Sequence, residues 1–260
     1  MRLIRFESAD GAVHAGRLVG DQTAQLLEAD LGGELQFGDT TVKVARLLAP
    51  VNPPNIFAIG RNYRAHVEET GARMPDSPLV FLKATTSLIG PGDAIELPAS
   101  APDAVDFEAE LAIVIGRSAR TIAPADALSH VLGYTCANDV SARDCQRDDK
   151  QWSRAKGFDT FCPLGPWIVT PDELDADDCV IRSRLNGKIM QESNTSHMMR
   201  GCRELISYLS HQFTLRPGTV ILTGTPEGVG FARTPPIFLA PGDRIEIEIE
   251  GIGTLGNMVR

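Results

Sequence analysis

Two glutamates lie two residues apart in the stretch DFEAELAIVIG, which begins at Asp106. They are Glu108 and Glu110, and an unbroken apolar run over residues 111–115 follows them. Such a run predicts a strand with both faces buried. Side chains at positions i and i+2 of a strand point to the same side, about 7 Å apart along the chain. The two carboxylates can therefore converge on one point.

Two bare carboxylates at a buried point repel each other and lose their hydration, and a divalent cation would remove both problems. Oxygen ligands suit Mg²⁺ or Mn²⁺, with Ca²⁺ as a further option, and do not suit Zn²⁺ in a thiolate site. A third oxygen ligand could come from Asp139, which ends an apolar stretch that begins near Val131. The pattern thus indicates a candidate metal site formed by Glu108, Glu110 and Asp139.

A plainer interpretation of the same pattern stays open. Glu246, Glu248 and Glu250 repeat the spacing in RIEIEIEG, where alternating isoleucines predict one apolar and one solvated strand face. Glutamates on a solvated face need no metal. Asp139, in turn, could simply form a turn at the end of a strand. Spacing alone does not separate these interpretations.

Other side chains that could act on a substrate lie in segments with helical patterns. His66 and Glu69 are three residues apart in NYRAHVEETG, and a carboxylate beside an imidazole fixes its tautomer and raises its basicity. Such a pair can take a proton from water, or it can be a polar pair on a helix surface. Lys156 lies between Trp152 and Phe158. Its ammonium could hold a substrate oxygen, or its stem could merely cover aromatic rings.

Two further segments have both a functional and a structural interpretation. Arg143 could bind a carboxylate through two hydrogen bonds, or it could pair with Asp144 or Asp148 at the surface. The glycines of TGTPEGVG would let the backbone approach a ligand closely. Pro226 in the same stretch is equally typical of a turn that ends a strand.

Strands outnumber helices in the pattern of the chain. Short strands and turns precede the Pro-rich stretch APVNPPN, so we expect a small N-terminal β domain over residues 1–52 and a larger domain over residues 53–260. A hairpin is expected at Asn186-Gly187, and a helix is expected where apolar residues from Met199 to Leu209 form one stripe. Because helices do not alternate regularly with strands, the pattern favours an α+β fold.

Composition excludes several classes of function. The chain has 260 residues and a formal net charge of −9 without clustered basic residues, which argues against nucleic acid as a partner. No apolar run approaches the ~20 residues that span a bilayer, and the N-terminus lacks the apolar segment of a secretory signal, so no membrane partner is expected. Five cysteines without a CxxC pair indicate reduced thiols and a cytoplasmic location.

Five stretches together resemble the fumarylacetoacetate hydrolase family, and their order and spacing agree with it from about residue 55 onward: IGRNYRAHVEE, DFEAELAIVIG, NDVSARDCQ, QWSRAKGFDTFCPLGP and LTGTPEGVG. The resemblance implies a mixed β-roll or β-sandwich with flanking helices and a small N-terminal β segment. It also implies that the protein assembles as a homodimer.

The resemblance also assigns roles to individual residues. It places metal ligands at Glu108, Glu110 and Asp139. It places catalytic groups at His66 and Glu69 on a lid and at Lys156. Substrate contacts are implied at four further positions: Arg143, Gln146, Gly224 and Thr225.

The implied substrate is a 2-oxo acid, of the 2,4-dioxo or 2-hydroxydienoic type, which reacts through an enolate held by the metal. We expect hydrolysis of a C–C bond in a β-diketo acid, because a His–Glu pair suits the activation of water. The N-terminal segment resembles that of bacterial members described as 2-hydroxyhepta-2,4-diene-1,7-dioate isomerases, so isomerisation is an alternative, as is decarboxylation of oxaloacetate. A non-catalytic dicarboxylate-binding protein would need no general base, and the His66–Glu69 pair argues against it.

Overall fold

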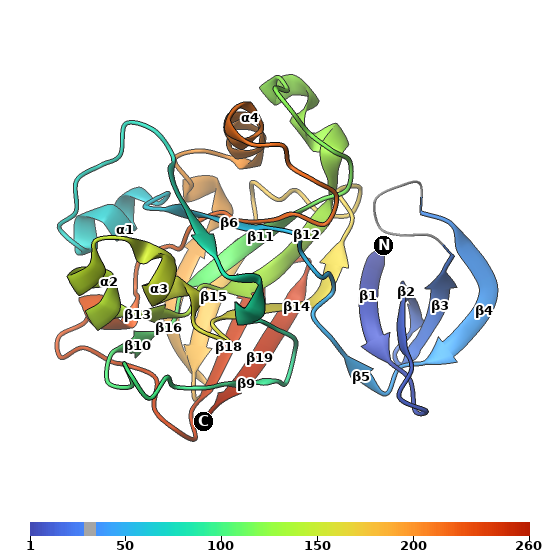
Figure 1. Ribbon diagram of the computed structural model, residues 1–260, viewed down its shortest axis with the longest axis horizontal. Coiled ribbons are helices and arrows are strands. Elements are labelled where there is room, and N and C mark those ends of the chain that lie inside the picture. The colour runs from blue at the N-terminus through green and yellow to red at the C-terminus, as the bar shows by residue number, and fades with distance from the viewer. Residues whose placement is uncertain (29–34) are drawn as a thin grey trace.

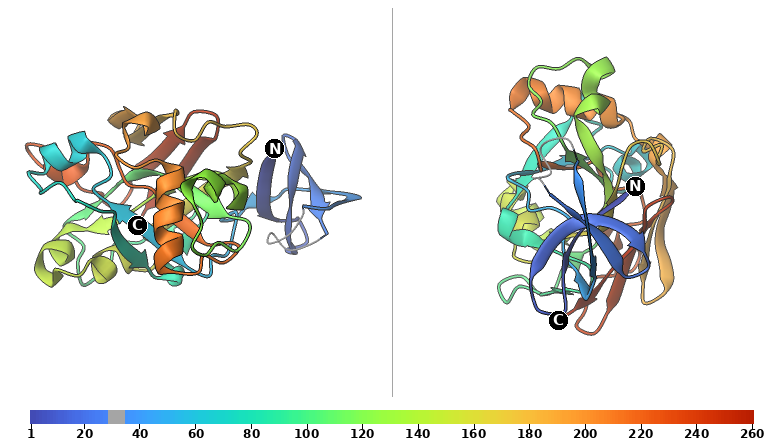
Figure 2. Two further views of the ribbon diagram at one scale, coloured as in Figure 1. Left: turned by 90° about the horizontal axis from the view of Figure 1, so that it is seen from above. Right: turned by 90° about the vertical axis from the view of Figure 1, so that its right-hand side faces the viewer.

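The computed structural model describes residues 1–28 and 35–260. Five N-terminal strands lie to one side of the molecule (Figures 1 and 2): β1 (Arg2–Glu7), β2 (Val13–Gly20), β3 (Thr23–Leu27), β4 (Phe37–Lys43) and β5 (Arg46–Leu47). Buried Ile4, Phe6 and Ala24 form a small hydrophobic cluster of their own there. Backbone pairing of β1 with β14 nevertheless joins these strands to the main sheet. The division at residues 52 and 53 therefore stays a prediction.

The main sheet continues through six strands that carry most of the site: β14 (Cys162–Val169), β12 (Val131–Asn138), β11 (Ala109–Ile115), β17 (Val220–Leu222), β6 (Ile56–Gly60) and β7 (Leu79–Lys83). A short strand, β8 (Leu88–Ile89), also pairs with β14. Every residue of β11 is buried, as its continuous apolar sequence predicts. Hydrophobic side chains fill both faces of β11, because its odd and even positions belong to two separate core clusters.

A second sheet packs against the first (Figure 1) and contains β16 (Lys188–Asn194), β15 (Val180–Leu185), β18 (Arg244–Ile249), β19 (Gly253–Val259) and β9 (Ala94–Ile95). β15 and β16 form the expected hairpin, and Asn186 and Gly187 at its tip have positive φ values of 52° and 80°. In β18 the isoleucines are buried and the glutamates are partly exposed, so its face is solvated as expected. The α+β class expected from the sequence is confirmed.

Three short helices gather at one end of the sheets (Figure 1): α1 (Arg64–Glu69), α2 (Arg143–Asp149) and α3 (Trp152–Gly157). β10 (Val105–Asp106) pairs with β13 (Ser141–Ala142) directly before α2. Single 3-10 turns lie at η1 (Thr85–Ser87), η3 (Thr195–His197) and η4 (Gly230–Ala232). Within the described residues, no helix is long and apolar enough to cross a membrane.

The fourth helix, α4 (Cys202–Gln212), packs beside the 3-10 segment η2 (Pro124–His130), away from the other three helices (Figure 1). It begins three residues later than the apolar stripe from Met199 indicates. Gly201 is extended, with a ψ of 174°, and the Asp177 carboxylate accepts a 2.9 Å hydrogen bond from the Cys202 amide. A carboxylate distant in sequence therefore caps the helix, which local periodicity does not reveal.

Candidate active site

The three carboxylates proposed as metal ligands meet at one end of the main sheet. β11 and β12 are antiparallel with Ala109 opposite Asn138, so the start of one strand lies beside the end of the other. The Asp139 amide donates to the Glu108 carbonyl oxygen at 2.9 Å and joins the two ends. One carboxylate oxygen from each of Glu108, Glu110 and Asp139 lies within 4.8 Å of the others, and all three residues are buried. These carboxylates are buried, whereas the glutamates on the solvated face of β18 are partly exposed.

Three buried cations surround these carboxylates. Lys156 on α3 donates to Glu108 and to Asp139, each at 2.7 Å. Lys83, the last residue of β7, donates to the other oxygen of Asp139. Arg143, the first residue of α2, contacts Glu108 at 2.7 Å. Each cation comes from a different element, so the cluster forms only when the sheet and the helices have assembled.

The two glutamates differ in their electrostatic environment. Burial alone would raise the pKa of Glu108, but Lys156 and Arg143 outweigh burial and hold the pKa of Glu108 well below its usual value. Glu110 pairs with no cation in the described part of the chain. Burial, followed by the charges of Asp139 and Glu108, raises the pKa of Glu110 well above its usual value. Glu110 is thus the carboxylate whose charge is not balanced.

Asp106 adds a fourth carboxylate behind the cluster. It contacts Arg143 at 2.9 Å and accepts hydrogen bonds from the amides of Gly230 and Phe231 at 2.8 and 3.0 Å. The buried cluster then contains four carboxylates and three cations, namely Asp106, Glu108, Glu110 and Asp139 with Lys83, Arg143 and Lys156. With all groups charged, one negative charge is in excess. An oxygen-only donor set with unbalanced negative charge fits a hard divalent cation, which Glu108, Glu110 and Asp139 would hold.

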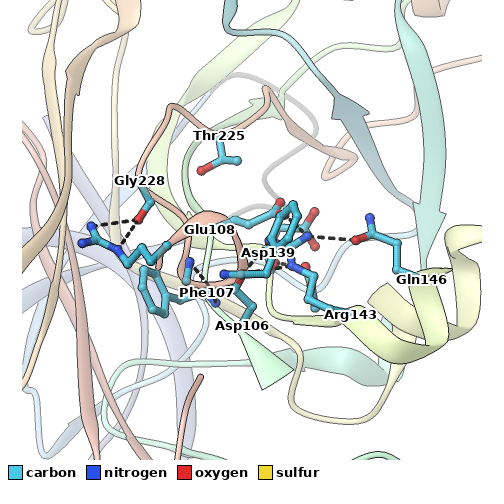
Figure 3. Close-up of polar contacts among 12 residues, drawn as sticks. Asp106, Phe107, Glu108, Asp139, Arg143, Gln146, Thr225 and Gly228 are labelled. Carbon is cyan, nitrogen blue, oxygen red and sulfur yellow. Dashed lines mark hydrogen bonds and ion pairs between the residues drawn. The ribbon is translucent and has the colours of Figure 1, made fainter. Parts of the chain in front are cut away.

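Arg143 faces the cluster and not the surface (Figure 3). It does not pair with Asp144 or Asp148, which would be its partners in a surface role. Its Nη1 donates to Gln146 Oε1 at 2.9 Å, one helical turn further along α2. Because burial is outweighed by Asp106 and Glu108, the pKa of Arg143 is raised above its usual value. The guanidinium thus stays charged beside the carboxylates.

His66 and Glu69 form a hydrogen-bonded pair on α1. His66 Nδ1 lies 2.8 Å from one Glu69 oxygen, and the other oxygen accepts a 2.8 Å hydrogen bond from the Gly228 amide. His66 is buried, with 8% of its surface exposed, so the pair is not a polar pair on a helix surface. Since Glu69 occupies Nδ1, Nε2 is the ring nitrogen left to exchange a proton with a ligand.

The loop after β17 contacts the carboxylate cluster through a backbone amide. The Gly224 amide donates to Glu110 at 2.6 Å, and Gly224 has a φ of 101°. A Cβ at Gly224 would lie 2.8 Å from Asn62 Cβ, so close packing requires glycine there. The Thr225 hydroxyl accepts a 2.7 Å hydrogen bond from Gln191 Nε2. The turn that the sequence suggested here is therefore also a support for the carboxylates.

A cavity of about 600 Å³ opens onto these groups. Most of the residues proposed from the sequence line it: His66, Glu108, Glu110, Asp139, Arg143, Gln146, Lys156 and Thr225. Glu69 and Gly224 lie behind this lining, where they hold His66 and Glu110. Aromatic side chains complete the wall: Phe81, Trp152, Phe231 and Phe238. The size and the mixed lining suit a small polar ligand.

Sequence reasoning missed three residues that hold the site together: Lys83, Asp106 and Gln191. Lys83 follows the apolar segment PLVFL directly, and Asp106 precedes Glu108 by two positions. An ionisable residue beside a buried strand could therefore have indicated both as site residues. Gln191 binds both Thr225 and the Ala109 amide, at 2.7 and 2.9 Å. Its place in an ordinary hairpin strand gave no signal.

Residues 55–260 match the family model described as fumarylacetoacetate (FAA) hydrolase C-terminal. The chain belongs to this family. Residues 1–50 match a second model, described as Rv2993c-like, N-terminal. The family expected from the five sequence motifs is confirmed.

Relatives within the fumarylacetoacetate hydrolase family cover most of the chain. Protein Rv2993c of Mycobacterium tuberculosis is 45% identical over an alignment of 267 positions that covers 100% of this chain and 98% of that protein. The mitochondrial oxaloacetate tautomerase Fahd2a of Rattus norvegicus is 43% identical over 244 residues, covering 86% and 78%. The solved 5-carboxymethyl-2-hydroxymuconate delta-isomerase from Mycobacterium smegmatis has a TM-score of 0.89 and 47% identity, covering 100% and 99%.

Proposed function

We propose that this protein is a divalent-metal-dependent enzyme that interconverts the enol and keto forms of 2-oxo acids. One observation carries the proposal: a buried carboxylate cluster and a hydrogen-bonded His66–Glu69 pair line or support the same cavity. The rat relative is named a tautomerase and the Mycobacterium smegmatis structure an isomerase. Both names denote rearrangement without cleavage, so tautomerisation ranks above the C–C hydrolysis expected from the sequence.

Glu108, Glu110 and Asp139 would hold the cation, for which Mg²⁺ and Mn²⁺ are the proposed species. When bound, such a cation supplies positive charge to the oxygens of a 2-oxo acid as the neighbouring carbon gains or loses a proton. Lys156 adds a second positive charge on the same side. Burial is outweighed by Asp139 and Glu108, which raise the pKa of Lys156 and keep it protonated.

Proton transfer is assigned to His66. In the enol-to-keto direction, Nε2 would take the hydroxyl proton and return a proton to the carbon next to the hydroxyl-bearing carbon, so the substrate neither gains nor loses atoms and the imidazole ends neutral. Glu69 stabilises the imidazolium formed in between, because its carboxylate lies 2.8 Å from Nδ1. Arg143, Gln146 and Thr225 offer polar atoms in the cavity wall for the substrate carboxylate.

Hydrolysis of a C–C bond is the second candidate, because the same His–Glu pair can remove a proton from water. The homodimer and the cytoplasmic location stay predictions. A non-catalytic dicarboxylate-binding protein stays the less favoured possibility, since binding alone would not require a paired imidazole.

The test follows the ultraviolet absorbance of enol-oxaloacetate in the presence of protein and either Mg²⁺ or Mn²⁺. We expect the enol signal to decay faster with the metal-loaded protein and at the background rate after chelation. Release of pyruvate from an acylpyruvate at a higher rate than enol decay would favour hydrolysis instead. No acceleration of either reaction by the metal-loaded protein would refute the proposal.

A further inference from the structure

Gln191 links separate segments of the site, although its own strand, β16, lies in the second sheet. Its side chain is buried, with 1% of the residue exposed. The side-chain amide contacts Ala109 at the start of β11 and both Thr225 and Pro226 in the loop after β17. Gln191 therefore joins the strand that carries Glu110 to a residue of the cavity wall.

The partners of Gln191 decide which side of its amide is oxygen and which side is nitrogen. The Ala109 backbone N–H can only donate, so the amide atom 2.9 Å away is Oε1. The Ser183 hydroxyl donates to the same oxygen at 2.9 Å. On the opposite side, the Pro226 carbonyl oxygen can only accept, so the amide atom 2.9 Å away is Nε2. Two independent backbone groups thus fix one orientation of the amide.

This orientation also fixes the role of the Thr225 hydroxyl. Nε2 of Gln191 lies 2.7 Å from Thr225 Oγ1, and an amide nitrogen can only donate. One Nε2 hydrogen is taken by the Pro226 carbonyl oxygen, and the other is taken by Oγ1. The Thr225 hydroxyl therefore accepts from Gln191, and its own hydrogen remains free for another partner.

The hydrogen of the Thr225 hydroxyl has no acceptor among the protein groups of residues 1–28 and 35–260. Thr225 is only 3% exposed, and it lines the cavity that Glu110 also lines. The preceding residue, Gly224, donates to Glu110 at 2.6 Å, so Thr225 lies beside the proposed metal site. A buried hydroxyl is rarely left without an acceptor. The acceptor that remains is an oxygen of the molecule that occupies this end of the cavity.

We propose that Gln191 is a positioning residue that makes the Thr225 hydroxyl a hydrogen-bond donor to an oxygen of the bound 2-oxo acid. The inference rests on the proposed function in so far as the ligand is a 2-oxo acid. Without the Nε2 donor, the hydroxyl could rotate and present a lone pair to the ligand oxygen, which would weaken binding. Gln191 also holds the Ala109 amide, so the donor keeps its place relative to β11.

The test is a double-mutant cycle, which separates action through Thr225 from a general effect on the fold. The dissociation constant of 2-oxoglutarate, a stable 2-oxo acid, is measured by calorimetry on the Mn²⁺-loaded protein. Thr225→Val keeps the shape of the side chain without the hydroxyl and should raise this constant by about tenfold or more. Gln191→Met should raise it by about threefold or more, because the hydroxyl stays but loses its orientation. In combination with Thr225→Val, Gln191→Met should have no further effect.

Gln25→Met is the matched control. Gln25 is also a strand glutamine that bridges two groups, since it accepts from Arg17 at 2.9 Å and donates to the Gly38 carbonyl oxygen at 2.7 Å. It lies in β3 and does not line the cavity, so its variant should bind 2-oxoglutarate as the unaltered protein does. Mn²⁺ affinity should be unchanged in Thr225→Val, which would show that the loss concerns the ligand and not the metal.

Gln191→Glu replaces Gln191→Met if the latter does not fold. It keeps an acceptor for Ala109 but puts an oxygen in place of Nε2, so the Thr225 hydroxyl can donate to that oxygen and binding should again weaken. The assignment is overturned if 2-oxoglutarate fails to bind, or if the Gln191 variant or Thr225→Val leaves its binding unchanged. Equal weakening by the Gln191 variant with and without Thr225→Val would also overturn it. Coupling of the two residues without enol turnover would instead refute the proposed function and leave the role of Gln191 standing.

Discussion

At the scale of single residues, Glu110 reduces the stability of the metal-free fold. Burial and two neighbouring carboxylates raise its pKa in the folded state. The contribution of a carboxyl group whose pKa rises on folding is fully present below its unfolded pKa, about 4.3. That contribution is lost as the pH rises through the folded pKa. At neutral pH, the buried Glu110 therefore opposes folding unless a cation is bound.

Replacing Glu110 with glutamine is expected to raise the melting temperature of the chelator-treated protein by about 2 °C or more at neutral pH. Glutamine removes the charge but keeps an oxygen that can accept the hydrogen bond from Gly224. The same variant should lose the increase in melting temperature that Mn²⁺ gives the unaltered protein. Thermal scans with chelator and with Mn²⁺ provide the measurement. A lower melting temperature in chelator would show that the charge of Glu110 is already balanced in the metal-free fold.

His66 is expected to act in proton transfer and not in metal binding. His66→Gln should lower kcat for enol decay by about 10²- to 10⁴-fold, the usual contribution of a general acid or base. Mn²⁺ affinity, measured by calorimetry, should change little, because the proposed metal ligands are the carboxylates of Glu108, Glu110 and Asp139 and do not include His66. An equal loss of turnover and metal affinity would mean that His66 belongs to the metal site.

At the scale of elements, the loop after β17 keeps the His66–Glu69 pair in position. Gly228 has a φ of 96°, and a Cβ there would lie 2.5 Å from the Met190 carbonyl oxygen. Gly228→Ala should therefore displace the amide that donates to Glu69 and lower kcat by about tenfold or more, for a shift in a hydrogen-bonded positioning group. Metal affinity should be retained.

The control for this variant is Gly187→Ala. Gly187 also has a positive φ, of 80°, but a Cβ there meets nothing within 4 Å, and Gly187 lies at a hairpin tip. It reproduces the backbone strain without the collision, so it should reduce stability and leave kcat unchanged. Equal kcat losses in both variants would show that general destabilisation, and not the contact with Glu69, is responsible.

Local sequence pattern predicted those elements whose environment is decided locally. The continuous apolar run of β11 and the alternating pattern of β18 indicated a buried strand and a half-solvated strand correctly, although glutamates two residues apart lie at the start of the first and within the second. The convergence of Glu108, Glu110 and Asp139 could be proposed because two of them are two residues apart beside an apolar run, although Glu108 lies just before β11 and not in it. The start of α4 could not be predicted, since its cap is the distant Asp177.

The partners of the site residues could not be derived from the pattern for a related reason. Lys83 and Asp139 are 56 residues apart, and Arg143 and Asp106 are 37 apart. Which cation meets which carboxylate depends on how β7, α2 and α3 pack at the end of the sheet. Charge pairs at such separations are products of tertiary structure, and the sequence revealed only that ionisable residues interrupt apolar segments there.

At the scale of the whole molecule, the N-terminal strands are expected to unfold separately from the site. Phe6 is fully buried in their own hydrophobic cluster, and Phe6→Ala should cost about 3–5 kcal/mol of stability. Hydrogen exchange should then show faster exchange in β1 to β4, with unchanged Mn²⁺ affinity and protection in β11 and β12. Uniform loss of protection across both regions would mean that residues 1–52 and 53–260 fold as one cooperative unit.

The short helix α3 has a consequence for how relatives with other substrates could arise. Trp152 and Lys156 both line the cavity, and both depend on the same single turn of helix. An insertion of one residue between them would swing one side chain by about 100° around the axis. The indole and the ammonium would then face different directions. The helical register of α3 therefore fixes the relative positions of these two side chains in the cavity wall. A relative that takes a longer or shorter substrate would need a different register of α3 before it needed a larger cavity.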